Sequence, residues 1–333
     1  TNTTNTAQTV TFMITPAANG CSGTPITATV IVNPTPIVTA TATPNPVCSG
    51  GTLSLGTIAG ASYLWSGPNG FSSTIQNPTI SNIQTNQSGT YNVTVTSSSG
   101  CTGTSSVSVT VNPVPVVTVN ATPNPVCSGG TLSLGTIAGA SYVWSGPNGF
   151  SSTIQNPTIS NIQTNQSGTY SVTVTSSAGC TGTGSVSVTV NPLPSPTASV
   201  TPNPVCTGNK VQFTASGGLS YAWSGPDGFS SNKQNPGRFI SSVSQGGTYT
   251  VTVTNAEGCS NTTTVNLVVN ETPNGTISAT PNPICEGSTL QLSATGGLSY
   301  LWSGPQGFTS TQQNPVINNF QYNQSGIYQV VIS

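Results

Sequence analysis

The sequence predicts an all-β protein made of tandem antiparallel β-sandwiches, and three observations lead to that prediction. The 333-residue chain repeats itself at a fixed interval. Apolar and small polar residues alternate over short stretches, as they do in strands with one buried face. Clusters of Gly, Pro and Asn separate these stretches, and no segment has the period of a helix. The interval is 79 residues, both between four tryptophans and between four cysteines: Trp65, Trp144, Trp223, Trp302, Cys48, Cys127, Cys206 and Cys285.

A proline-rich linker closes each repeat. Residues 33–36 read Asn-Pro-Thr-Pro, and the motif returns at 112–115 and 191–194, with a looser copy at 270–273. Each proline fixes its own φ and restricts the residue before it, so these linkers are stiff and mark domain boundaries. We therefore expect the C-terminal part of a truncated unit at 1–34, complete units at 35–113, 114–192 and 193–271, and a unit truncated before its last strand at 272–333.

The first complete unit contains seven predicted strands. Pro44-Asn45-Pro46 ends the first strand, and Gly67-Pro68-Asn69-Gly70 turns the chain after the third. Seven short strands, with turns about every 8 to 12 residues, fit an antiparallel Ig-like sandwich. The strands are predicted around residues 38–42, 53–55, 62–66, just after 70, 80–83, 90–96 and 107–111.

Two aromatic positions recur in every unit. A tryptophan on the third strand of a sandwich is more often the centre of the core than a platform for carbohydrate. A tyrosine at the start of the sixth strand is typical of a tyrosine corner, whose hydroxyl bonds back to the backbone. We therefore expect these residues to form the core: Trp65, Trp144, Trp223, Trp302, Tyr91, Tyr170, Tyr249 and Tyr328.

Charge is nearly absent from the chain. Only 2% of the residues are charged, against about a quarter in a typical soluble protein, and all seven lie between Lys210 and Glu286. Without a Lys/Arg cluster we expect no nucleic acid partner, and without an apolar run of about 20 residues we expect no membrane insertion in this segment. There is no histidine and the four carboxylates are scattered. The sequence therefore predicts no enzyme, no metal site and no cofactor.

The eight cysteines recur at fixed positions without a Cys-x-x-Cys motif, which predicts disulfides and an oxidising, extracellular compartment. In an Ig-like topology Cys48 would begin the second strand and Cys101 would follow the sixth, at the opposite end of the sandwich. That separation is on the order of 20 Å, well beyond the roughly 7 Å that a disulfide spans between Cα atoms.

We therefore expect bonds between units, because the bottom of one unit would face the top of the next in a head-to-tail rod. The expected pairs are Cys48–Cys180 and Cys127–Cys259. Cys21 and Cys101 would then pair with cysteines before Thr1, and Cys206 and Cys285 with cysteines beyond Ser333. The alternative set lies within units: Cys48–Cys101, Cys127–Cys180 and Cys206–Cys259.

Several motifs together resemble a known family. They are Val47-Cys-Ser-Gly-Gly-Thr-Leu-Ser-Leu, Tyr63-Leu-Trp-Ser-Gly-Pro-Asn-Gly-Phe, Gly89-Thr-Tyr-Asn-Val-Thr-Val, Gly100-Cys and Val109-Thr-Val-Asn-Pro. Over nearly the whole chain they look like the PKD/Ig-like tandem repeats of large Bacteroidota surface proteins, some of which are gliding-motility adhesins exported by type 9 secretion. The resemblance implies a segment of an extracellular, cell-surface adhesin stalk or filament, and we read the chain as a piece of a longer secreted protein.

Two functional hypotheses follow. The first is a non-enzymatic stalk that sets reach, because the first two units differ at only four positions between Thr43 and Pro113. The second is a polysaccharide-binding module array, which would need exposed aromatic residues outside the core pattern. Both hypotheses leave two kinds of partner open. One is further copies of the chain in a fibre, and the other is surface glycans or a polysaccharide. The candidate exposed aromatic residues are Phe239, Phe320 and Tyr322.

Overall fold

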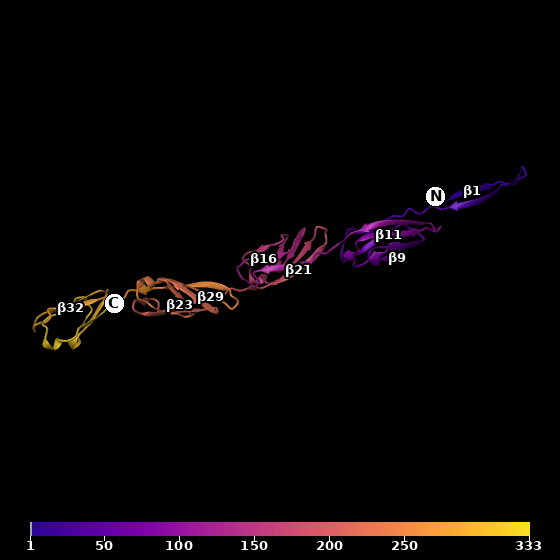
Figure 1. Cartoon of the computed structure of the whole chain (residues 1–333). Helices are drawn as coiled ribbons and strands as arrows, with labels where there is room; N and C mark the ends of the chain where they lie inside the picture. Colours follow the sequence, from indigo (N-terminus) through magenta and orange to yellow (C-terminus); the bar gives the residue numbers. More distant parts are fainter. Residues whose placement is uncertain (1) are drawn as a thin grey trace. The chain divides into compact units, whose positions relative to one another are not determined.

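The structure of the chain is a computed structural model that describes residues 2–333. It contains β-strands and single 3-10 turns, with no α-helix among the described residues. The chain divides into two compact units, Thr1–Val190 and Asn191–Ser333. Figure 1 labels a selection of the strands and colours the chain by residue number. The boundaries expected at 34, 113 and 271 stay predictions, and the one expected at 192 lies close to this division.

The first unit begins with a hairpin and continues with two complete repeats. In the hairpin, β1 (Gln8–Ile14) pairs antiparallel with β4 (Ile26–Val32), and β2 (Ala17–Ala18) with β3 (Cys21–Ser22). The first repeat consists of β5 (Ala40–Thr43), β6 (Val47–Cys48), β7 (Leu53–Thr57), β8 (Ser62–Ser66), η1 (Pro68–Gly70), β9 (Ser72–Ser73), β10 (Thr79–Ile80), η2 (Thr85–Gln87), β11 (Gly89–Thr96), β12 (Thr102–Val109) and β13 (Val111–Asn112).

The second repeat reproduces these elements one by one. It consists of β14 (Val119–Thr122), β15 (Val126–Cys127), β16 (Leu132–Thr136), β17 (Ser141–Ser145), η3 (Pro147–Gly149), β18 (Ser151–Ser152), β19 (Thr158–Ile159), η4 (Thr164–Gln166), β20 (Gly168–Thr175), β21 (Thr181–Val188) and β22 (Val190–Asn191).

The second unit contains a third and a fourth repeat. The third consists of β23 (Thr197–Thr201), β24 (Val205–Cys206), β25 (Lys210–Ser216), β26 (Ser220–Gly225), β27 (Phe229–Ser231), β28 (Gly237–Phe239), η5 (Val243–Gln245), β29 (Gly247–Thr254), β30 (Ser260–Leu267) and β31 (Val269–Asn270). The fourth consists of β32 (Thr276–Thr280), β33 (Leu290–Thr295), β34 (Tyr300–Ser303), η6 (Pro305–Gly307), β35 (Thr309–Ser310), β36 (Val316–Ile317), η7 (Tyr322–Gln324) and β37 (Gln329–Ile332).

Each complete repeat is an Ig-like sandwich, as the sequence predicts. In the first repeat a three-stranded sheet, β10-β7-β5, and a four-stranded sheet, β12-β11-β8-β9, enclose one core. Trp65 lies at its centre with none of its surface exposed, and its indole Nε1 donates to Gln76 O at 3.2 Å. Alternation with period two explains the two faces, because Tyr91, Val93 and Val95 on β11 are fully buried while the residues between them face outward.

The chain deviates from the predicted strands in two places. Of the strand predicted around Ile80 and Ile83, only Thr79–Ile80 (β10) forms. Ile83 lies in the turn that follows, where it is still fully buried. The predicted seventh strand is interrupted at Thr110, whose N–H donates to the side-chain Oδ1 of Asn45 at 3.0 Å. The Asn45 amide also donates to Ser108 O at 2.7 Å, so one side chain holds the Pro-Asn-Pro corner against the interruption. Asn124 and Asn203 repeat this contact.

The expected tyrosine corner is present in all four repeats. Tyr91 Oη donates to Gln87 O at 3.0 Å, and the hydroxyls of the equivalent tyrosines make the same bond four residues upstream. Tyr328 is only partly buried, whereas the other three tyrosines are fully buried, because β37 pairs with β34 alone among the described residues and has no partner equivalent to β12.

These buried hydroxyls predict how stability depends on pH. Burial raises the pKa of Tyr91 and Tyr170, and it raises the pKa of Tyr249 although Arg238 opposes the effect. A raised pKa in the folded state means that the free energy of unfolding is constant below the ordinary tyrosine pKa of about 10 and falls above it. With no histidine in the chain, we expect equal urea midpoints at pH 5, 7 and 9 and a lower midpoint at pH 11.

The variant Tyr170→Phe provides the control for this measurement. It removes one ionisable hydroxyl and its bond to Gln166 O, so we expect a lower midpoint at pH 7 and a smaller further loss at pH 11. A midpoint that falls equally in both proteins at pH 11 would assign the alkaline loss to other groups.

Candidate functional site

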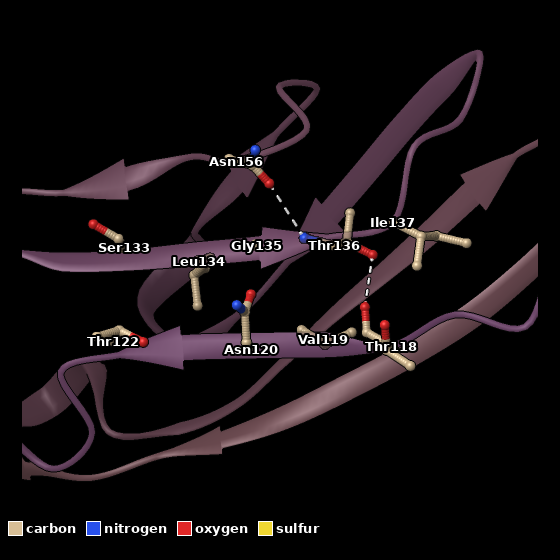
Figure 2. A pocket seen from close by; sticks show the side chains of 10 residues that line it. All are labelled: Thr118, Val119, Asn120, Thr122, Ser133, Leu134, Gly135, Thr136, Ile137 and Asn156. Atoms are coloured by element: carbon tan, nitrogen blue, oxygen red, sulfur yellow. Dashed lines mark hydrogen bonds between the residues drawn. The ribbon is translucent and has the colours of Figure 1, made fainter.

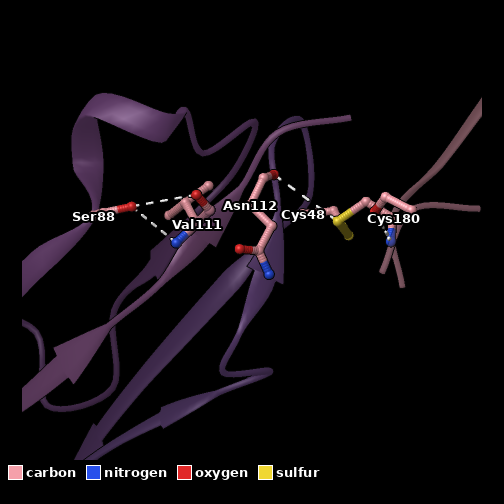
Figure 3. Close-up of a disulfide and its surroundings, with 6 residues drawn as sticks. Cys48, Ser88, Val111, Asn112 and Cys180 are labelled. Atoms are coloured by element: carbon pink, nitrogen blue, oxygen red, sulfur yellow. Dashed lines mark hydrogen bonds between the residues drawn. A yellow bond between two sulfur atoms is a disulfide. The ribbon is translucent and has the colours of Figure 1, made fainter. Parts of the chain in front are cut away.

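A disulfide joins the first repeat to the second. Cys48 and Cys180 form a bond with an S–S distance of 2.01 Å and a Cα–Cα distance of 5.7 Å, across 132 residues of sequence. Figure 3 shows this bond beside Asn112, the last residue of β13. The bond and the peptide linker that starts at Pro113 are therefore two covalent connections between the same two sandwiches.

The first repeat positions Cys48 through a short parallel strand pair. Val47 and Cys48 of β6 lie opposite Val111 and Asn112 of β13, so Cys48 lies at the end of the sandwich where the chain leaves it. Ser88 fixes the same exit, because the N–H of Val111 donates to its Oγ at 2.9 Å (Figure 3). The sequence places Cys48 at the start of the second strand, which is wrong: β6 is a separate strand, and β7 begins at Leu53.

The second repeat positions Cys180 in the tight turn between β20 and β21. Ser176 N–H donates to Cys180 O at 2.8 Å, and Cys180 N–H donates to Ser176 Oγ at 3.2 Å. The Cys180 sulfur lies 3.9 Å from Asn112 O. The turn of the second repeat thus meets the exit of the first repeat, and Cys48 lies on the neighbouring strand.

The other cysteines do not form the alternative, intra-repeat pairs. Cys21, Cys101, Cys206 and Cys285 form no disulfide within residues 2–333, which excludes both Cys48–Cys101 and Cys206–Cys259. Cys180 is bonded to Cys48, which excludes Cys127–Cys180. Cys127 and Cys259 are also disulfide-bonded. The Cys101 sulfur lies 4.0 Å from Asn33 O, just as the Cys180 sulfur lies near Asn112 O one repeat later.

A hollow lies on the outer face of the three-stranded sheet of the second repeat. It has a volume of about 520 Å³, and Figure 2 shows its uncharged lining on β14 and β16. Thr136 Oγ1 donates to Thr118 O at 3.0 Å, and Asn156 Oδ1 accepts from Thr136 N–H at 3.3 Å. Gly135 opens its centre, since a Cβ there would lie 2.3 Å from Asn120 Oδ1. The first repeat has the same hollow, with a volume of about 420 Å³.

The third repeat carries different chemistry on that face. Its hollow of about 360 Å³ is lined by Lys210, Gln212 and Phe239. Phe239 and Tyr322 are exposed, as the second hypothesis requires, but Phe320 is not: it is 5% exposed and packs in the core of the fourth repeat. Phe320 takes the position of Ile83, so the 79-residue spacing would have identified it as a core residue.

The titratable side chains of the described residues form one ion pair and no cluster suited to a metal ion. No group of three His, Cys, Asp or Glu side chains could hold a metal ion within residues 2–333. One ion pair is present there, between Arg238 Nη2 and Asp227 Oδ2 at 3.7 Å, and it belongs to the packing of the third repeat. The four tryptophans are all at most 2% exposed and offer no stacking surface.

Two family models match parts of the chain. Residues 196–269 match the PKD domain, and residues 1–36 match the PKD-like domain. The third repeat is therefore similar to a PKD domain, and the N-terminal hairpin to a PKD-like domain. These matches cover the third repeat and the N-terminal hairpin, and the other repeats share the 79-residue spacing of the third. No curated protein matches the chain. No helix in residues 2–333 has the length and apolar character to cross a membrane.

Solved structures with a similar fold have low sequence identity. Three N-terminal domains of the bacteriophage RB49 outer capsid protein Hoc are 14% identical, with a TM-score of 0.31, over 70% of this chain and 94% of that one. The N-terminal eight Ig domains of the Down Syndrome Cell Adhesion Molecule are 13% identical, with a TM-score of 0.33, over 97% of this chain and 57% of that one. Murine CEACAM1b is 14% identical, with a TM-score of 0.28, over 46% of this chain and 99% of that one.

Proposed function

We propose that this chain is a non-enzymatic spacer segment of an extracellular surface adhesin or filament, and that it acts as a stalk that sets reach. The Cys48–Cys180 disulfide is the observation that carries this proposal. Consecutive domains joined by a peptide linker alone are expected to move relative to each other. A second covalent connection beside the linker restricts that motion, which is useful to a spacer and of no evident use to a catalyst.

Two further features support the same role. The first and second repeats differ at four positions between Thr43 and Pro113, so they add length without adding a new surface. Their surface is uncharged and rich in Ser, Thr and Asn. The disulfides favour an oxidising, extracellular location. The finer assignment, to gliding-motility adhesins exported by type 9 secretion, is part of this proposal and rests on the motif resemblance described above.

The repeat spacing extends the proposal to the second pair of bonded cysteines. Cys127 and Cys259 occupy the positions of Cys48 and Cys180 one repeat later, so we propose that they form the equivalent bond. Cys206 and Cys285 would continue the series in following repeats. The edge strands β9 and β12 carry no lysine, and we propose that glycans or a neighbouring copy in a fibre cover them.

Small-angle X-ray scattering on the chain tests the spacer role. We would compare the chain with a variant in which residues 114–192 occur twice. A spacer predicts that the maximum dimension increases by the length of one repeat while the cross-section stays constant. Cys48→Ser should lower the maximum dimension by allowing the joint to bend, and Cys101→Ser should not. An unchanged maximum dimension after the duplication would refute the proposal.

A further inference from the structure

The outer face of the three-stranded sheet in the third repeat differs from its counterparts. Lys210 on β25 lies directly opposite Phe239 on β28. The next pair along, Val211 and Arg238, points to the opposite face, since Val211 is buried in the core. Lys210 and Phe239 therefore stand side by side on the outward face, and 53% of the Phe239 surface is exposed.

These two residues border a hollow that is suited to one small ligand unit. Its volume of about 360 Å³ lies near the lower end of the roughly 300 to 1,000 Å³ range of ligand sites. Gln212 Nε2 donates to Asn235 O at 2.8 Å, which fixes the amide. Gln212 Oε1 then lies over Gly237, 3.5 Å from where a Cβ would be. The hollow thus combines an aromatic face, a cation, an amide oxygen and the Thr201 hydroxyl.

The other repeats lack this combination at the same positions. The second repeat has Thr131 and Ser160 where the third has Lys210 and Phe239, and the first has Thr52 and Ser81. The fourth has Thr289 and Asn318. Threonine at the first position, and Ser or Asn at the second, therefore serve the fold, so the fold does not require Lys210 and Phe239.

Protection of a sheet edge does not explain Lys210. A lysine that guards against strand pairing lies on an edge strand, whereas β25 is the central strand of β23-β25-β28. Its ammonium makes no ion pair and no side-chain hydrogen bond within residues 2–333. An unpaired cation beside an exposed phenyl ring is available to a ligand that carries both a negative charge and an apolar face.

Arg238, which precedes Phe239 on β28 and points to the inward face, holds Phe239 in place. Arg238 replaces Ile80 and Ile159 of the earlier repeats, and its side chain is 10% exposed. Its Nη1 donates to Pro226 O at 2.9 Å and to Tyr249 Oη, and its guanidinium carbon lies 5.0 Å from the centre of the Phe229 ring. These contacts anchor β28 to the core and so limit the ordering cost that a ligand at Phe239 would meet.

We propose that this face of the third repeat binds an acidic saccharide. The phenyl ring of Phe239 packs against the apolar face of a sugar ring, and Lys210 pairs with its carboxylate. The Thr201 hydroxyl donates to a sugar oxygen, and Gln212 Oε1 accepts a hydrogen bond from a sugar hydroxyl. A peptide strand would instead pair with the backbone of an edge strand, so the outer face favours a saccharide over an acidic peptide. This activity goes beyond the spacer role and does not depend on it.

Titration of the full oxidised chain with trigalacturonate, followed by NMR or calorimetry, tests the proposal. The methyl ester of the same trisaccharide removes only the charge. We expect the acid to bind more tightly than the ester and to lose affinity with added salt. Phe239→Ser should weaken the binding of both ligands by about tenfold or more, and Lys210→Thr should remove the preference for the acid while leaving ester binding unchanged.

The chain supplies its own controls for folding. Both substitutions import the residues that the second repeat carries, so both variants should unfold at nearly the temperature of the original chain. Ser160→Ala and Thr131→Ala change the equivalent positions of the second repeat and should leave binding unchanged. No binding to trigalacturonate, equal affinity for the acid and its ester, tighter binding of oligoglutamate than of trigalacturonate, or binding that survives Phe239→Ser would each overturn the proposal. The scattering result for the spacer is independent of all four outcomes.

Discussion

Breaking the Cys48–Cys180 bond should lengthen the fully unfolded chain by about 435 to 475 Å when it is pulled from its two ends. The bond bridges 132 residues, and an extended chain spans about 3.3 to 3.6 Å per residue. While the bond is intact, a pulling force passes through the two sulfur atoms and does not extend the residues between them. The first repeat beyond Cys48 and most of the second are therefore shielded from extension.

Single-molecule force spectroscopy measures this length directly. The measurement should use a chain with Cys127→Ser and Cys259→Ser, because these two cysteines are also disulfide-bonded and would obscure the release. Adding Cys48→Ser should then give the same total length as reduction. Cys101→Ser is the matched control, because Cys101 forms no disulfide among the described residues. Equal contour lengths with and without Cys48 would show that the bond does not form in solution.

The fold could be predicted from the sequence because the same pattern of strands and turns recurs in every repeat. The 79-residue spacing, the period-two alternation and the Gly-Pro-Asn-Gly turn locate the sandwich without any long-range information. The turn works because Asn69 and Gly70 both adopt positive φ, 57° and 74°, which few other residues do readily. The Asn45 contact could not be predicted, because its side chain bonds to Ser108 and Thr110, which lie 63 and 65 positions further along the chain.

The candidate sites differ in how far the sequence reveals them. The length of the sixth strand already predicts that Cys48 and Cys101 lie too far apart to bond, although Cys48 belongs to β6 and not to the predicted second strand. The Lys210 and Phe239 pair depends on the register between β25 and β28, which a sequence with 28 intervening residues does not specify. Phe239 could be identified as an unusual aromatic residue, but its neighbour could not. Phe320 lies at the buried position that Ile83 takes in the first repeat, so the prediction that it is an exposed aromatic residue is wrong.

Trp144→Ala should lower the free energy of unfolding of the second repeat by about 3 to 5 kcal/mol. The side chain is 1% exposed, and its Nε1 donates to Ile154 O at 2.9 Å, so the substitution leaves both a cavity and an unpaired carbonyl. A domain of this size has a stability of roughly 5 to 15 kcal/mol, so the loss removes a large share of it.

Hydrogen exchange on the full chain resolves this effect by repeat. Amides of β20, which pairs with the Trp144 strand β17, should exchange faster by a factor that corresponds to the lost stability, while amides of the equivalent strands β11 and β29 should keep their rates. Val143→Ala is the matched control on the same strand, because Val143 is 62% exposed and should change stability by about 0.5 kcal/mol at most. If the two substitutions accelerated exchange equally, Trp144 would not be the centre of the core, and the shared position of Trp65, Trp223 and Trp302 would need another explanation.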